Sequence, residues 1–151
     1  MRVQKGYTFA ELIVIVCILA VLTYVTVPRF QFGAIDRGQA ERVAWEIVTG
    51  LRRTRSLAIS EAATNSDGFA LNIQQADRTI TYEIVNCGNN NVVDSHAIDS
   101  RVDLSGEMAF EFGLLGALKA TDDSALEVTA AEKTFTIRVI PATGMVKCVE
   151  N

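Results

Sequence analysis

Residues 7–27 form an apolar run that contains a single charged side chain, Glu11. A helix of about 20 residues is roughly 30 Å long, so the length of this run predicts a membrane-spanning helix. A carboxylate inside such a helix is costly unless another group pairs with it. Glu11 therefore indicates a partner outside the apolar run.

The helical pattern resumes after Pro28. Between residues 36 and 63, apolar side chains recur at helical spacing, at Val43, Ile47, Leu51 and Ala58. We therefore predict one long helix that is bent near Pro28, with its first half (residues 7–30) transmembrane and its second half packed on a sheet. The sequence Asn65-Ser66-Asp67-Gly68 then predicts a turn.

The remainder of the chain, residues 68–151, alternates apolar and polar side chains in short segments separated by Gly, Asn and Asp. About seven strands are expected, at residues 69–73, 79–85, 97–104, 108–112, 126–129, 134–140 and 145–149. The predicted fold class is α+β, with the long bent N-terminal helix packed on a mostly antiparallel β domain.

Two ordinary interpretations of the N-terminus compete. A cleaved secretory signal peptide would account for the basic residues Arg2 and Lys5. The apolar run, however, is long and is not followed by a cleavage site of small residues. A plain membrane anchor would account for the length of the run and would leave Glu11 unexplained.

At these residues the chain resembles the type IV pilin and pseudopilin class. Gly6, Tyr7, Thr8 and Glu11 match the end of the basic leader, the aromatic first mature residue, the Thr that follows it and the Glu at the fifth mature position. Pro28 lies where many members have a helix-kinking proline. The fold that this resemblance implies is the pilin-like fold. The aromatic residue is Tyr7 instead of the usual Phe, which is a mild departure.

The resemblance also implies how the N-terminus is processed. A prepilin peptidase would remove residues 1–6 by cutting between Gly6 and Tyr7, and would methylate the new amine of Tyr7. That amine stays cationic, so the Glu11 carboxylate of one subunit would pair with the N-terminus of a neighbour in a fibre. Opposite charges attract far more strongly at low dielectric than in water, so this pairing would also set the register between subunits.

Later segments narrow the resemblance to the GspH/FimT-like group of minor pseudopilins and minor pilins. Residues 51–59 are similar to the late-helix signature of that group, and residues 112–113 and 137–146 are similar to its strand and terminal-hairpin patterns. Residues 31–151 would then be a periplasmic GspH/FimT-like domain. The group implies a single-pass inner-membrane protein that enters a periplasmic or surface fibre. Its expected partners are other pilins or pseudopilins, the prepilin peptidase and, before assembly, inner-membrane lipid.

Three functions follow as alternatives. The first is a minor pseudopilin that takes part in the initiation or tip assembly of the pseudopilus of a type II secretion system. The second is a minor type IV pilin, with DNA uptake as an associated role. The third is an unrelated periplasmic binding domain on an uncleaved anchor, for which Gly6 would have no importance.

The charge of the chain does not favour a nucleic-acid partner. The sequence has 14 Lys and Arg residues against 18 Asp and Glu, a net charge of −4 at pH 7. The densest basic cluster is Arg52, Arg53 and Arg55, and helical geometry directs Arg53 away from the other two. Phosphate binding would therefore have little electrostatic driving force.

The three cysteines leave two states open. A bridge between Cys87 and Cys148 would close a loop of about 60 residues, for which chain entropy gives roughly 4 kcal/mol. The alternative is two free buried thiols. Cys17 lies in the apolar run and is interpreted as a packing residue.

No enzymatic, metal or cofactor site is predicted. His96 is the only histidine and is expected in a polar surface loop without a nucleophile motif nearby. Asp122 and Asp123 lack the alternating oxygen ligands of a calcium loop. We therefore expect a structural protein without a small-molecule substrate.

Overall fold

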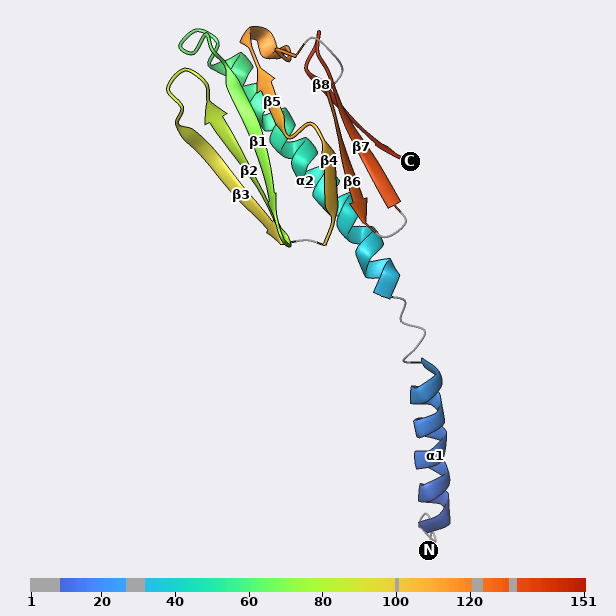
Figure 1. Cartoon of the computed structure of the whole chain (residues 1–151). Coiled ribbons are helices and arrows are strands. Elements are labelled where there is room, and N and C mark those ends of the chain that lie inside the picture. Colours follow the sequence, from blue (N-terminus) through green and yellow to red (C-terminus); the bar gives the residue numbers. More distant parts are fainter. Residues whose placement is uncertain (1–8, 27–31, 100, 121–123, 131–132) are drawn as a thin grey trace, which may run out of the picture. The chain divides into compact units, whose positions relative to one another are not determined.

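The computed structural model describes residues 9–26, 32–99, 101–120, 124–130 and 133–151. Its contacts divide the chain into two compact units, residues 1–32 and 33–151. Helix α1 (Phe9–Thr26) belongs to the first unit. Helix α2 (Phe32–Ser60) and all the strands build the second (Figure 1).

The described N-terminal region contains two helices instead of the predicted single long one. Helix α1 is described over 18 residues. Within the described residues, neither helix is both long enough and apolar enough to cross a membrane. The predictions of a long transmembrane N-terminal helix and of a single-pass inner-membrane location were therefore wrong.

Pro28 lies outside the described residues, as do Gly6 and Tyr7, so the structure does not test the predicted kink or cleavage site.

Helix α2 buries one face, as its periodicity predicts. Val43, Ile47 and Leu51 are fully buried, and Ala58 is nearly so. Gly50 lies among them, where a Cβ atom would come within 3.1 Å of the Tyr82 ring and 3.0 Å of Leu71. The glycine thus allows the sheet to approach the helix closely.

The strands form two four-stranded antiparallel sheets. The first sheet has the order β3-β2-β1-β5, with β1 (Phe69–Ala76), β2 (Thr79–Asn86), β3 (Val92–Asp99) and β5 (Ala109–Phe112). The second has the order β4-β6-β7-β8, with β4 (Asp103–Gly106), β6 (Ser124–Ala130), β7 (Lys133–Ile140) and β8 (Met145–Glu150).

The described strands also differ from the predicted set. The expected strand at residues 97–104 is the end of β3 and the start of β4, which pair in different sheets. His96 belongs to β3 and is not in a loop. Strand β3 lies at the edge of its sheet, where polar side chains such as His96 are tolerated. Because the first part of β3 is polar, the sequence pattern did not predict it as a strand.

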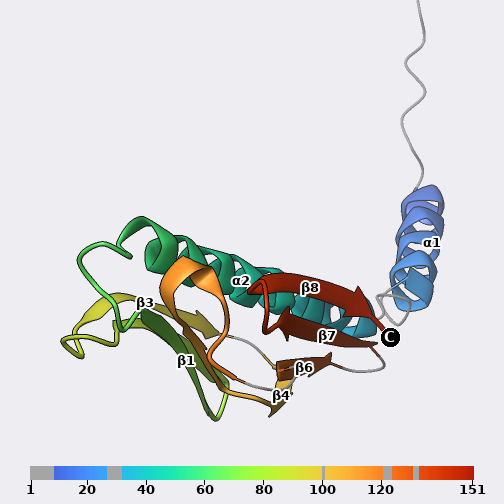
Figure 2. The ribbon, with the colours of Figure 1, turned by 90° about the horizontal axis from the view of Figure 1, so that it is seen from above.

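Helix α2 lies across the same side of both sheets (Figures 1 and 2), and their inner faces share one core with it. The connection that follows β5 contains the short 3-10 helix η2 (Leu114–Gly116). After it, the amide of Leu118 donates to Pro141 in the β7–β8 turn, and that of Lys119 donates to Glu111 in β5. These bonds link the two sheets at one end of the domain.

Candidate functional site

Helix α1 presents apolar side chains in every direction. From Leu12 to Leu22 its large aliphatic side chains are between 46% and 62% exposed, and Phe9 is 80% exposed. The hydroxyl of Thr23 donates to the carbonyl oxygens of Leu19 and Ala20, so this polar group is satisfied within the helix. A helix that is hydrophobic all round is normally buried, so α1 requires an apolar environment.

One side of α1 is slightly hollowed. A shallow depression of about 360 Å³ runs along the helix at positions one helical turn apart, lined by Ile13, Val14, Cys17, Ile18, Val21 and Leu22. Small and branched side chains leave room there for the side chains of a second helix. Cys17 is an exposed free thiol among these lining residues.

Glu11 lies in the first turn of α1. A carboxylate in that position interacts favourably with the unpaired amides at the helix N-terminus. Glu11 also has an interaction within the chain. Glu11 is therefore the acidic residue of the first described turn of α1.

The two cysteines of the folded domain are free thiols in the structure. Cys87 follows β2 in the first sheet, and Cys148 lies in β8 of the second. Burial raises the pKa of both thiols above the ordinary value of 9.0. For Cys87 the nearby Glu111 raises the pKa further, whereas Lys119 lowers it.

This environment predicts a slow reaction of Cys87 with iodoacetamide. Because the thiolate is the reactive form and a raised pKa lowers its fraction, a variant that retains only Cys87 should react more slowly at pH 8 than a small unhindered thiol. Glu111→Gln should accelerate the reaction by about twofold or more, and Lys119→Gln should slow it, as measured by mass spectrometry. Equal rates in both variants would contradict this electrostatic account.

The three arginines of the basic cluster point to three different contacts. Arg52 stacks over the Trp45 ring at 5.9 Å, and Arg55 donates through Nε to the Thr143 carbonyl at 3.1 Å. Arg53 pairs with Asp94 of β3, with 2.5 Å between Nη1 and Oδ2. Each of the three guanidinium groups therefore already has a contact within the folded unit.

His96 is part of a polar contact between β3 and α2 that sequence reasoning missed. Its Nε2 atom lies 3.8 Å from Oε2 of Glu46, and the other carboxylate oxygen of Glu46, Oε1, lies 3.9 Å from Nε of Arg42. The His96 ring packs against that of Tyr82, with 5.5 Å between centroids. Together with the Arg53–Asp94 pair, these contacts connect the edge strand β3 to helix α2.

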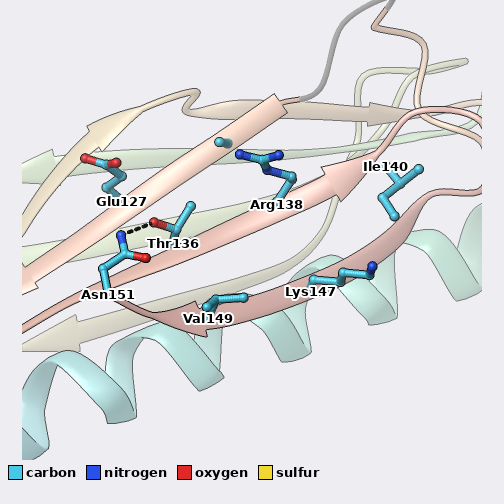
Figure 3. Close-up of a pocket in the computed structure, with 8 residues that line it drawn as sticks. Glu127, Thr136, Arg138, Ile140, Lys147, Val149 and Asn151 are labelled. Atoms are coloured by element: carbon cyan, nitrogen blue, oxygen red, sulfur yellow. Dashed lines mark hydrogen bonds between the residues drawn. The ribbon is translucent and has the colours of Figure 1, made fainter.

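A wide groove of about 620 Å³ crosses the outer face of the second sheet (Figure 3). It lies on the face opposite the buried side chains Leu126, Ile137 and Val146, and its lining alternates with them along the strands. The lining residues come from three neighbouring strands and the C-terminal residue: Ala125, Glu127, Thr136, Arg138, Ile140, Lys147, Val149 and Asn151. Alternation in the sequence shows which side chains face outward, but it does not show that these residues meet.

Comparison with known proteins found one informative similarity. The chain is similar to Fimbrial protein Q of Moraxella bovis, with 31% identity over 81 residues, which are 54% of this chain and 50% of that protein. The chain therefore spans about half the length of this curated relative. No family model and no solved structure matches. The similarity supports the pilin class for this chain and does not extend to the GspH/FimT-like subgroup.

Proposed function

We propose that this chain is a non-enzymatic structural subunit of a pilin-like fibre, in which α1 is buried among the equivalent helices of neighbouring subunits. The observation that carries this proposal is the exposure of apolar side chains on every side of α1. Burying such side chains stabilises an assembly by about 25 cal/mol per Å² of apolar surface. The similarity to a fimbrial protein supports the same role.

Within this role, we propose that Glu11 pairs with the amine of a neighbouring subunit. Removal of residues 1–6 by a prepilin peptidase would create that amine at Tyr7, and methylation there would leave its positive charge. The apolar side chains that follow Glu11 would hold the pair at low dielectric, where an unpaired charge is costly. The pair would therefore select one axial register between subunits.

The proposal predicts that Glu11→Gln lowers incorporation into fibres by about tenfold or more, since a lost charge pair of 1.4 kcal/mol already corresponds to that factor. Cleavage at Gly6 should continue in this variant. Incorporation is measured by immunoblotting sheared fibres against the total cell content. The matched control is Glu41→Gln, which removes an exposed carboxylate from α2 and should leave incorporation unchanged.

A second variant separates processing from assembly. Gly6→Val should block cleavage, and the uncleaved chain should then be absent from the fibres. Wild-type incorporation by both the Gly6→Val and the Glu11→Gln variants would refute the fibre role. It would favour the third function considered above, a binding domain on an uncleaved N-terminal segment.

We further propose the minor pseudopilin of a type II secretion system as the specific role, with a minor type IV pilin as the alternative. A photo-crosslinking amino acid at Ile18, in the depression along α1, would capture the neighbouring helix. Pseudopilins among the adducts would support the secretion role, and pilus subunits would support the alternative.

A further inference from the structure

We infer that the free edge of strand β8 pairs with the same strand of a second copy of this chain, antiparallel and with the two Cys148 residues directly opposite each other. This inference goes beyond the proposed fibre role and does not depend on α1. It concerns only the folded unit of residues 33–151.

The hydrogen-bond pattern of β8 carries the first step. Strand β8 is the last strand of the second sheet and forms its outer edge (Figure 1). The Asn151 amide donates to the Thr134 carbonyl at 2.9 Å, in register with the ladder of β7 and β8. Bonded and non-bonded pairs alternate along an antiparallel ladder. The N–H and C=O groups of Val146, Cys148 and Glu150 therefore point away from β7.

These backbone groups define the kind of partner. Within the described residues, β7 is the strand that pairs with β8, and it pairs on one side only. A row of N–H and C=O groups at a sheet edge is a template for one further strand. The partner that this edge recognises is thus an extended backbone.

The opposite outer edge of the fold, β3, is less suited to such pairing. Its register with β2 shifts after Ile84, so that Val93 is an extra residue in β3. A bulge of this kind twists an edge strand and hinders the addition of another strand. Strand β8 pairs with β7 without any shift from Met145 to Glu150. The regular edge is therefore β8.

The charges of β8 select one register for two copies. A two-fold axis perpendicular to the sheet keeps each side chain on its own face, so residues of the same face meet. Centring the pair on Lys147 would place two like charges directly opposite each other. Centring it on Val149 would pair only the end of the strand. Centring it on Cys148 pairs the whole of β8 and places Lys147 opposite Val149 of the second copy.

Helix α2 has a charged flank beside this edge. Glu41, Trp45 and Arg52 share the flank by helical spacing, and Arg52 lies over the exposed Trp45 ring. Burial raises the pKa of the Cys148 thiol, Arg52 lowers it and Glu41 raises it, so both charges lie near the thiol. Since 11 residues of helix separate Glu41 and Arg52 by about 16 Å, Cys148 lies between them.

The arrangement of these two charges favours a second copy over an unrelated strand. A two-fold axis at Cys148 runs the two α2 helices in opposite directions. Glu41 of one copy then lies on the same side of the axis as Arg52 of the other, and the reverse holds on the far side. The flank is thus self-complementary in charge, and the exposed Trp45 side chains lie between the opposite charges.

The first test is disulfide trapping in the full chain, with mild detergent covering α1. Cys17→Ala and Cys87→Ala leave Cys148 as the single thiol. Diamide is the oxidant: it takes two protons and two electrons from the thiols of two copies, and an S–S bond forms between them. Directly opposite residues of a bonded pair have Cα atoms about 5.5 Å apart, which suits a disulfide.

Covalent dimers of the Cys148 variant should form at least about tenfold faster than those of a variant that retains only Cys87, as measured on non-reducing gels. The Cys87 variant is the matched control, because its thiol is also partly buried and burial raises its pKa too. It also retains α1, so association through that helix affects both variants alike.

Charged variants test the register. Val149→Lys should slow trapping of Cys148 by about tenfold, because the new charge lies directly opposite Lys147 of the other copy, twice per dimer. Adding Lys147→Glu should restore the rate, since opposite charges then meet. Val92→Lys is the matched control: Val92 is 53% exposed on the edge strand β3, Val149 is 57% exposed, and the control should change the rate by less than about twofold.

Hydrogen exchange tests the edge without any substitution. Under reducing conditions, the amides of Val146, Cys148 and Glu150 should exchange about tenfold more slowly when the protein concentration is raised about a hundredfold, as mass action requires for a dimer. The amides of β3 should show no such dependence.

Three results would overturn the inference: trapping of Cys148 no faster than that of Cys87, equal effects of Val149→Lys and Val92→Lys, or exchange of the β8 amides that does not depend on concentration. Exchange that slows only when a different polypeptide is added would assign the edge to that partner and would also overturn it. None of these outcomes bears on the effect of Glu11→Gln on fibres.

Discussion

Gly68→Ala is expected to destabilise the folded domain by about 3 kcal/mol or more. Gly68 has a φ of +77°, and a Cβ atom at this position would lie 2.0 Å from the carbonyl oxygen of Phe112. The variant would therefore combine a left-handed conformation of a non-glycine residue with a contact that only backbone movement can relieve. Phe112 pairs with Phe69 in the first sheet, so the movement would disturb β1 and β5 together.

Thermal unfolding of the full chain in mild detergent measures this effect. A loss of about 3 kcal/mol should lower the Tm by roughly 12 °C. Gly38→Ala is the control, because no atom lies within 4 Å of a Cβ atom at that position in α2. Alanine has the higher helix propensity, so this variant should gain about 0.5–1 kcal/mol. Similar Tm values for the two variants would refute the steric account of Gly68.

Asn65→Asp is expected to cost about 2–4 kcal/mol at neutral pH, although the change is nearly isosteric. Asn65 is buried, and its amide nitrogen donates to the Gly68 carbonyl at 2.7 Å and to Asn86 Oδ1 at 3.0 Å. Its oxygen accepts the Asp67 amide at 3.1 Å. A carboxylate would keep the last bond and would direct negative charge at the other two acceptors, which then lose their donor.

The same variant should show a characteristic pH dependence. Two facing acceptors favour the protonated carboxyl, so its pKa in the folded state should lie above the value of about 3.9 in the unfolded chain. The folded state then holds the proton over a range where the unfolded state has lost it. Stability relative to the parent chain should therefore fall as pH rises through the unfolded pKa, and recover as pH is lowered.

Denaturant unfolding at several pH values measures this difference. Asn89→Asp is the matched control, because the Asn89 oxygen accepts the Asn91 amide in an exposed turn. A carboxylate can make that same bond, so the control should change stability by less than about 0.5 kcal/mol. A stability loss of Asn65→Asp that is constant with pH would refute the hydrogen-bond account.

These two positions also show how the connection from α2 to the first sheet is built. The turn residues Asn65-Ser66-Asp67-Gly68 predict an end to the helix from their local chemistry alone. Their long-range partners, Asn86 at the end of β2 and Phe112 at the end of β5, have no signal in the sequence. The turn thus joins three segments that are distant along the chain.

Local periodicity accounts for what the sequence by itself determined. The buried face of α2 and the alternation of Phe135, Ile137 and Val139 in β7 follow from positions near one another in the chain, and all of them are buried as predicted. The apolar run that contains Glu11 is likewise a local pattern. It predicted a helix at the residues of α1, whose apolar side chains are exposed in the structure.

Only the tertiary structure decided the features that depend on which distant residues meet. It separated residues 97–104 into strands of two sheets, and it directed Arg52, Arg53 and Arg55 to three unrelated contacts. It also placed Arg138 opposite Lys147. Alternation assigns a side chain to a face of a sheet, but the register between strands selects its neighbours, and that register results from the packing of the whole domain.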